Sequence, residues 1–261
     1  MLIGALLLAL LGAGLFVGVF FTRKRLTALL MAASRTAAEL LGTVKSVSGE
    51  IGGGGFKEVV EVVGTVVCAS PMTSPLAGKP CVAYTMKVLR EYEEDYEEKD
   101  SQGKVTKGTR RGSEVIQSDD RECDFTVRDA TGELPVHARG ADFEGMVESF
   151  SRFDPGAGGA TLSIGSFNLT LSANTARRRT LGYRSSERIF PLGGRVTIIA
   201  EASDAHGQLA LGKGEQSFIV STRTRQEMRG SAETKAKVLG VCGTLSIVGA
   251  VVCLVLGLVK G

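Results

Sequence analysis

Few side chains in this chain are suited to catalysis. The two histidines, His137 and His206, are the only candidates for a neutral-pH general base, and they lie far apart in the sequence. A Ser-His-acid site needs a histidine beside a nucleophile, and neither histidine has a nucleophile-elbow motif near it. We therefore expect neither residue to act in catalysis.

The cysteines do not form a metal-binding pattern. They occupy positions 68, 81, 123, 242 and 253, and none forms a C-x-x-C pair. A zinc site needs clustered Cys and His ligands, and these spacings do not provide one. We interpret the cysteines as small, mostly buried apolar residues and predict no metal.

Cofactor motifs are also missing from the sequence. It contains neither a P-loop nor a dinucleotide-binding fingerprint, and the glycine run 52–55 reads better as a flexible linker than as a phosphate cradle. The formal net charge of +3 is too small to indicate a nucleic-acid partner. We predict no catalytic residues, no cofactor and no nucleic acid, and we lean away from an enzyme.

Two segments contain no charged side chain, residues 2–21 and residues 238–259. At about 1.5 Å per residue they would form helices of roughly 30 and 33 Å, which is the thickness of a bilayer core. A cleaved signal peptide is the alternative for the first segment. No Lys or Arg precedes it, however, and Arg23, Lys24 and Arg25 follow it, which favours an uncleaved anchor. We predict one transmembrane helix in each segment.

Small residues recur at helical spacing in both predicted spans. Gly14 and Gly18 are four apart in the first, and Gly249, Cys253 and Gly257 are four apart in the second. Such stripes allow helices to approach closely. The two spans could pack against each other or against copies of themselves. A homo-oligomer, including an oligomeric pore or sensor, is therefore an alternative interpretation.

The flanking charges predict an orientation. Lys and Arg follow the first span directly, and five of them lie in residues 223–237 before the second, whereas only Lys260 follows the second. Because positive charge stays on the cytoplasmic side, we expect a multi-pass protein with a cytoplasmic central domain and its termini outside.

The segment between the spans reads as mainly β. Residues 23–50 form an amphipathic helix or linker, with helical apolar spacing over 26–44, and a β-rich domain covers 55–225. Alternating apolar residues predict strands at 58–68, 82–92, 123–127, 134–138, 161–171, 195–201, 208–212 and 216–221. One internal helix is predicted over 141–152. Many short strands favour a barrel or a sandwich, with an OB-like barrel as one candidate.

A charged hairpin is predicted over residues 90–111. Residues 90–100 carry seven acids and two bases, and residues 104–111 carry four bases. The simpler interpretation is a solvated loop whose two arms neutralise each other. The functional interpretation is a docking site for a protein partner.

Three motifs stand out between the spans. Their residues are Ser74, Pro75, Leu76, Gly78, Lys79, Pro80, Cys81 and Tyr84; Phe125, Asp129 and Gly132; and Tyr183, Arg184, Glu187, Pro191, Gly193 and Glu201. These motifs resemble the GIDE family, the MULAN or MAPL type of membrane domain, which includes prokaryotic members, and the resemblance covers about residues 55–225 and both spans. Ala200 stands before Glu201 where the family pattern has glycine. Their residue types indicate turns and strand ends, so we predict structural roles.

The resemblance also bears on activity. Family members that transfer ubiquitin use a RING, which needs eight Cys or His ligands for two zinc ions, and this sequence contains no such cluster. We therefore expect a membrane-anchored binding or scaffold module that recognises a protein or a lipid near the bilayer. The alternative is a ubiquitin-ligase relative that acts only with a separately encoded RING.

Overall fold

The computed structural model describes residues 2–99, 103–156, 161–164, 167–170, 178–205 and 207–259. Three helices are present in this part of the chain: α1 (Leu2–Met31), α2 (Ala37–Ile51) and α3 (Arg225–Val259). The strands are β1 (Ala33–Ser34), β2 (Lys57–Val67), β3 (Met72–Thr73), β4 (Pro80–Lys99), β5 (Val105–Glu122), β6 (Phe125–Arg128), β7 (Glu133–Val136), β8 (Asp142–Glu144), β9 (Val147–Pro155), β10 (Thr161–Ile164), β11 (Phe167–Thr170), β12 (Arg178–Pro191), β13 (Arg195–Ser203), β14 (Ala210–Gly212) and β15 (Ile219–Ser221).

The chain forms two compact units. The first contains residues 1–64, 127–144 and 195–261, and the second contains residues 65–126 and 145–194. The segment 55–225, predicted as one β-rich domain, therefore contributes to both. The second unit is built from two long insertions into the sequence of the first.

The first unit is organised around a closed barrel. β2 pairs with both β6 and β13, β6 pairs with β7, β7 with β14, and β14 with β13, which closes a ring of five strands. Counted in chain order, β7 is the third strand of the ring and β14 is the fifth, and these two strands pair in parallel. A five-stranded ring with this connectivity is an OB fold, so the predicted β barrel and its OB-like character are confirmed. Apolar side chains that alternate along β2, such as Val60 and Val62, are buried in the core.

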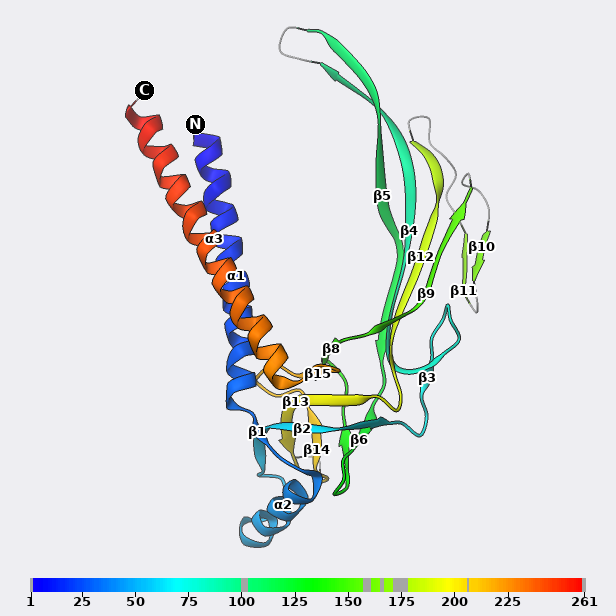
Figure 1. Cartoon of the computed structure of the whole chain (residues 1–261), viewed down its shortest axis with the longest axis vertical. Helices are drawn as coiled ribbons and strands as arrows, with labels where there is room; N and C mark the ends of the chain where they lie inside the picture. The colour runs from blue at the N-terminus through cyan, green and yellow to red at the C-terminus, as the bar shows by residue number, and fades with distance from the viewer. Residues whose placement is uncertain are drawn as a thin grey trace. The chain divides into compact units, whose positions relative to one another are not determined.

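The second unit is a curved antiparallel sheet (Figure 1). Its order is β3-β4-β12-β9, and β5 pairs with the edge of β4 opposite to β12. β4 and β5 pair from Ala83 opposite Glu122 to Lys99 opposite Val105, with one register shift between Val88 and Leu89. Its core contains Leu76, Cys81, Tyr84, Met86, Val88, Tyr183 and Ile189. β10 and β11 form a separate two-stranded sheet. The apolar pattern of residues 161–171 is compatible with a strand pair or with one bulged strand, and the structure has the strand pair.

The predicted helix at 141–152 is wrong. This segment forms β8, which pairs with β15, and β9, which pairs with β12. Between them lies Gly145, whose φ of +81° requires a residue without a Cβ. The apolar residues that suggested helical spacing, such as Phe143 and Phe150, instead meet partner strands that are distant in the sequence.

The amphipathic helix predicted over 26–44 is interrupted. α1 ends at Met31, and Ala33 and Ser34 pair in parallel with Val60 and Glu61 of β2. A new helix, α2, then begins at Ala37. Its start has the reciprocal bonds of a capping box, because Thr36 N donates to Glu39 Oε2 at 2.8 Å and Glu39 N donates to Thr36 Oγ1 at 3.3 Å.

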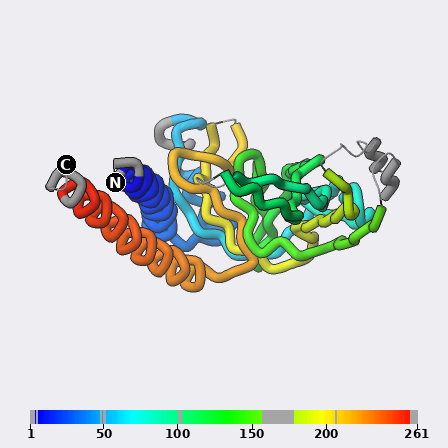
Figure 2. Tube along the Cα trace, turned by 90° about the horizontal axis from the view of Figure 1, so that it is seen from above, coloured from blue at the N-terminus to red at the C-terminus, as the bar shows by residue number. Residues whose placement is uncertain are grey.

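α1 and α3 lie side by side as an antiparallel pair within the first unit (Figures 1 and 2). The contacts at their glycines show the direction, because residue numbers fall on α3 as they rise on α1. Leu8 lies against Gly249, and Gly18 lies against Leu239. Both chain termini are therefore at the same end of the pair.

Candidate functional site: the apolar helix pair, the charged hairpin and the motif loop

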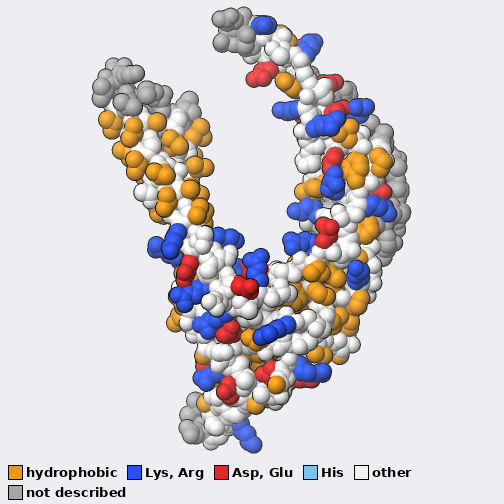
Figure 3. All heavy atoms as spheres, in the orientation of Figure 1, with side chains coloured by type: hydrophobic (Ala, Val, Ile, Leu, Met, Phe, Trp, Pro, Cys, Tyr) orange, Lys and Arg blue, Asp and Glu red, His pale blue; other side chains and the backbone are white. Residues whose placement is uncertain are grey.

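The helix pair presents an apolar surface. Two segments are long and apolar enough to cross a membrane, Leu6–Met31 and Arg225–Val255. Large apolar side chains cover the outside of both helices (Figure 3), and Phe20 and Leu245 are 66% and 65% exposed. Water would penalise so large an apolar patch, whereas lipid would not. The charge-free segments predicted as spans lie within these helices.

Glycines hold the two helices in close contact. A Cβ on Gly12 would lie 2.8 Å from Ile247 Cγ1, and one on Gly243 would lie 3.2 Å from a ring carbon of Phe16. Among the glycines of the two helices, these two have the shortest distances from an added Cβ to the opposite helix. The four-residue spacing of small residues in the sequence does not predict them.

The predicted packing residues divide into two groups. Gly18 and Gly249 lie on the α1–α3 interface, where an added Cβ would contact Leu239 at 3.4 Å and Leu8 at 3.6 Å. A Cβ on Gly14 would meet nothing within 4 Å, so Gly14 faces away from α3. Cys253 is half-buried, and Gly257 lies in the last turns of α3.

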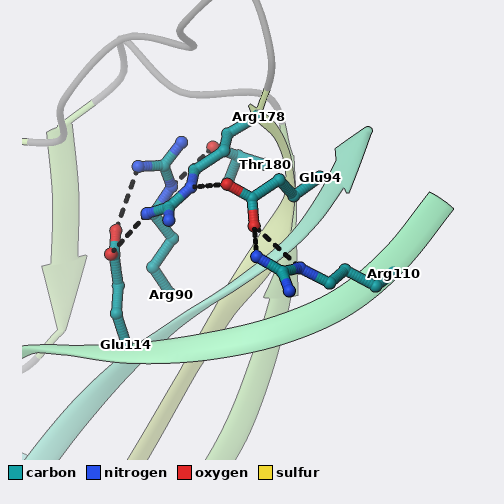
Figure 4. Close-up of polar contacts among 6 residues, drawn as sticks. All are labelled: Arg90, Glu94, Arg110, Glu114, Arg178 and Thr180. Carbon is teal, nitrogen blue, oxygen red and sulfur yellow. Dashed lines mark hydrogen bonds and ion pairs between the residues drawn. The ribbon is translucent and has the colours of Figure 1, made fainter. Parts of the chain in front are cut away.

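The charged hairpin carries a network of ion pairs (Figure 4). Glu94 of β4 accepts hydrogen bonds from Arg110 of β5 at 2.8 Å and from Arg178 of β12 at 2.9 Å. Arg90 is buried and reaches Glu114 at 3.1 Å and Thr180 at 2.8 Å. The acidic arm is therefore neutralised by two neighbouring strands rather than by the basic arm alone.

The network continues along the sheet. Glu93 accepts from Arg179 and from Arg111, and Glu91 accepts from Arg184 at 2.7 Å. The hydrogen bonds from Arg179 and then Arg111 lower the pKa of Glu93, because they favour the ionised carboxylate. Arg178 and then Arg110 lower the pKa of Glu94 in the same way.

The sequence analysis does not predict that β12 takes part in this network. Arg178 also lies over the ring of Tyr92, 4.7 Å from its centroid, a cation–π contact that adds to the ion pair. The three arginines that β12 contributes to this network, Arg178, Arg179 and Arg184, follow Tyr92 in the sequence by more than 80 residues. Only an expectation that β12 pairs with β4 could have identified them.

The Ser74–Tyr84 motif forms a tight loop over a buried carboxylate. Glu187 is fully buried, and its Oε2 accepts from Leu76 N at 2.7 Å. Its Oε1 accepts from Ala77 N at 3.2 Å and from Ser149 Oγ at 2.6 Å. Buried charge is tolerated when hydrogen bonds satisfy it, so Glu187 holds this loop in place.

The other residues of this motif define the shape of the loop. Ser74 N donates to Lys79 O at 2.9 Å, and Gly78 N donates back to Ser74 O at 3.0 Å. Gly78 has a φ of +66°, a conformation that favours glycine. Pro75 precedes the turn and Pro80 begins β4.

Cys81 and Tyr84 extend from this loop into the core of the second unit. Burial, with a smaller contribution from Glu187, raises the pKa of the Cys81 thiol to about 11. Burial and the hydrogen bond to Asp119 raise the pKa of Tyr84 to about 12. Both groups are neutral at pH 7, so neither is prepared to act as a nucleophile.

The second motif connects a turn to a helix. Oδ1 of Asp129 accepts from Thr131 N and Gly132 N at 2.7 and 2.9 Å, and Oδ2 accepts from Ala37 N, the first residue of α2, at 2.7 Å. Asp129 therefore closes the β6–β7 turn and caps α2. Phe125, at the start of β6, is buried.

The third motif is distributed over β12 and β13. Tyr183 is buried, and Arg184 belongs to the charged network. Pro191 ends β12, and Gly193 follows it with a φ of +72° and donates to Val66 O at 2.9 Å. Glu201 lies in β13 opposite Gly212.

The remaining candidates for chemistry do not come together. His137 follows β7, where its backbone N donates to Leu211 O at 2.9 Å, and His206 lies outside the described residues. Among the residues that the structure describes, no group of three or more His, Cys, Asp or Glu side chains could hold a metal ion.

Comparison with known families tests the resemblance of the three motifs. A family model named GIDE, described as an E3 ubiquitin ligase, matches residues 93–257. This match covers more than half of the 261 residues. The chain belongs to the GIDE family. No curated protein and no solved structure matches it.

The family match includes two of the three motifs. The segments containing Asp129 and Glu187 lie within it, whereas the Ser74–Tyr84 loop precedes it. The GIDE membership predicted from sequence is confirmed. The structure adds that these motif residues close turns, cap a helix and hold a loop.

Proposed function

We propose that this GIDE chain is a membrane-anchored binding module, which recognises a protein or a lipid near the bilayer and performs no chemistry of its own. The observation that carries the proposal is the antiparallel pair of α1 and α3, whose outer surfaces are apolar over a length that suits a bilayer. The structural roles of the family motif residues support a non-catalytic domain.

The proposed orientation places the barrel in the cytoplasm. Arg23, Lys24 and Arg25 follow the charge-free part of α1, and Lys235 and Lys237 precede that of α3. The antiparallel packing of the helices supports one common side for both termini. Positive charge retained on the cytoplasmic side would then put the termini outside.

A protein partner is proposed to bind the outer part of the charged hairpin. Near its base, Glu93 and Glu94 are neutralised by arginines of two strands. Farther out, Glu97 pairs with Lys107, and both side chains are more than half exposed. Exposed pairs of this kind contribute little stability, so their charges are available to a partner.

Photo-crosslinking from the hairpin tests this partner site. A crosslinking amino acid at Val105, which is 49% exposed near the outer end, should give one discrete adduct in native membranes. The same substitution at Val115, 54% exposed but near the base, is the matched control. Glu97→Lys with Glu98→Lys should abolish the adduct. Equal adducts from both positions, or an adduct that survives charge reversal, would reject the hairpin as the docking site.

Ubiquitin ligation is the second candidate function, favoured by the description of the matching family. It would require a RING, whose eight Cys or His ligands are not clustered anywhere in residues 1–261. Purified full-length chain in detergent, mixed with ubiquitin and its activating and conjugating enzymes, should form no ubiquitin conjugates. Conjugates formed by the chain alone would overturn the proposal that it performs no chemistry.

A further inference from the structure

A pocket of about 340 Å³ lies within the first unit, where α1 and α3 meet the barrel. Phe21, Thr22 and Arg25 of α1 line one side, and Met228, Ser231, Ala232 and Lys235 of α3 line another. β8 contributes Asp142 and Glu144, and the segment between β14 and β15 contributes Lys213 and Phe218. Neither the family description nor the proposed partner site assigns a role to this pocket.

The pocket contains an excess of positive charge. Four cations and two carboxylates line it, which gives a surplus of two positive charges. Arg25 engages both carboxylates, because its Nη1 lies 2.9 Å from Asp142 Oδ2 and its Nη2 lies 2.6 Å from Glu144 Oε1. Both carboxylates of the pocket are therefore neutralised by Arg25.

Three cations of the pocket remain available to a ligand. Lys213, Arg223 and Lys235 are exposed, and none of them forms an ion pair with any residue in the described part of the chain. The Ser217 and Ser231 hydroxyls also line the pocket. Cations and hydroxyl donors gathered around one cavity are the ligands that a phosphate group needs.

The depth of the pocket indicates the source of that phosphate. Phe21 is the last residue of the charge-free part of α1, and Lys235 lies three residues before the charge-free part of α3. The pocket is therefore at the level where apolar helix meets water, which is the level of lipid headgroups. The exposed rings of Phe20 and Phe21 would contact the acyl chains beside it.

We infer that this pocket binds the headgroup phosphate of an anionic phospholipid in the leaflet nearest the barrel. The inference rests on the proposed membrane anchoring. Lys213, Arg223 and Lys235 bind the phosphate, and the surplus of positive charge selects anionic over zwitterionic lipids. Arg25 positions α1 through its bonds to β8 and does not need to leave its carboxylates.

Tryptophan fluorescence offers a direct test, because the chain contains no Trp. Full-length chain carrying Phe21→Trp is placed in nanodiscs that contain brominated phosphatidylglycerol or brominated phosphatidylcholine as a minor component. Bromine quenches only a nearby indole. We expect strong quenching by the anionic lipid at a concentration at least tenfold below that needed for the zwitterionic lipid.

Charge variants then locate the site. Lys213→Gln, Arg223→Gln and Lys235→Gln together should remove the tenfold preference. The matched control combines Lys45→Gln, Lys57→Gln and Lys79→Gln, which removes the same charge from exposed positions outside the pocket. If the triple pocket variant fails to fold, Lys235→Gln alone should reduce the preference at least threefold.

The outcomes separate this inference from the proposed anchoring. Two results would overturn the lipid site. One is equal quenching by both lipids in the Phe21→Trp chain that keeps Lys213, Arg223 and Lys235. The other is a loss of lipid preference in the control variant as large as that in the pocket variant. Inorganic phosphate that reverses the quenching at millimolar concentration would show a site for free phosphate instead and would also overturn it. Alkaline extraction of the same membranes tests anchoring separately, since a chain that resists extraction yet shows no lipid preference keeps its anchor and loses only this site.

Discussion

At the scale of residues, two acids of the family motifs act as hydrogen-bond acceptors for backbone amides. Glu187 satisfies two backbone amides of the Ser74–Tyr84 loop and one hydroxyl from β9. Asp129 satisfies two amides in its own turn and the first amide of α2. Each carboxylate thus connects segments that are distant in the sequence.

Removal of the Glu187 carboxylate should destabilise the second unit. Glu187→Ala leaves Leu76 N and Ala77 N without their acceptor, and Ser149 Oγ keeps its 3.2 Å contact with the backbone O of position 187. Two unsatisfied buried donors of this kind cost about 3 kcal/mol in total. Urea unfolding of the full chain in detergent, followed by circular dichroism, measures the change. Glu148→Ala, an exposed acid on β9, should change the free energy of unfolding by less than about 0.5 kcal/mol. Equal effects would contradict this role.

Asp129 should make stability depend on acid pH. Partial burial acts to raise the pKa of Asp129, but hydrogen bonds from Ala37 N, Thr131 and Gly132 N outweigh it and hold the pKa below the ordinary value of 3.8. A pKa lowered by folding means that this stabilisation is present above pH 3.8 and disappears as the pH falls through the lowered value.

Comparison with Asp129→Asn measures that contribution. The variant should be less stable than the unsubstituted chain at pH 6, and the difference should shrink as the pH falls below 3.8. Urea unfolding at pH 6, 4 and 3 provides the data. A difference that stays constant across this range would show that the charge of Asp129 is not responsible.

At the scale of elements, the helix pair depends on which face each glycine occupies. Gly12 and Gly18 face α3, whereas Gly14 faces away from it. A search for glycines four residues apart identifies a small-residue stripe but not its partner. The same limitation applies to the hairpin, where the arginines of β12 neutralise acids that the sequence pairs only with the basic arm.

Gly12→Leu should separate α1 from α3, because its Cβ alone would lie 2.8 Å from Ile247. Oxidation of Leu8→Cys with Gly249→Cys reports the contact, and Gly12→Leu should lower the yield of this intramolecular disulfide several-fold. Gly14→Leu, with open space around its Cβ position, should leave the yield unchanged. A similar loss in both variants would contradict the described interface.

Gly14 is instead suited to contact with another copy. Its exposed position on α1 is where homo-oligomerisation through the spans would act. If the spans associate in this way, Gly14→Leu should abolish crosslinked dimers in native membranes while Gly4→Leu, at another glycine with no neighbour within 4 Å, should not. Recovery of monomer alone from the unsubstituted chain would exclude such an oligomer.

At the scale of the whole molecule, the chain is an OB barrel with two long insertions. Residues 65–126 interrupt the sequence between the first and second barrel strands, and residues 145–194 interrupt it between the third and fourth. These insertions pair with each other through β4, β9 and β12 to make the second unit. α1 precedes the first barrel strand in the sequence and α3 follows the last one, so an apolar helix is attached on each side of the barrel sequence.

The proposed topology predicts which side of the membrane Cys68 faces. Cys68 is half-buried and its thiol donates to Asp124 O at 3.5 Å, whereas Cys242 and Cys253 lie within α3. A membrane-impermeant maleimide should label Cys68 in inverted membrane vesicles and not in right-side-out vesicles. Cys68→Ser is the control that identifies the labelled residue. Labelling of Cys68 in right-side-out vesicles only would reverse the proposed orientation.

The sequence by itself determined the features that depend on local patterns. Charge-free segments of bilayer length, alternating apolar residues and turn residues such as Gly78 and Gly132 act over a few residues, so they were readable without a structure. The family followed from the same short motifs. The helix predicted over residues 141–152 is wrong because the spacing of the apolar residues is compatible with a helix and with a strand. Pairing with β15 and β12 makes this segment the strands β8 and β9.

Only the tertiary structure decided the features that depend on contacts between distant segments. The ring of five strands, the carboxylate of Glu187 beneath a loop more than 100 residues away, and the pocket between Phe21, Lys213 and Lys235 arise when remote parts of the chain meet. Such contacts are selected by the total free energy of packing and hydrogen bonding, which no single stretch of sequence contains.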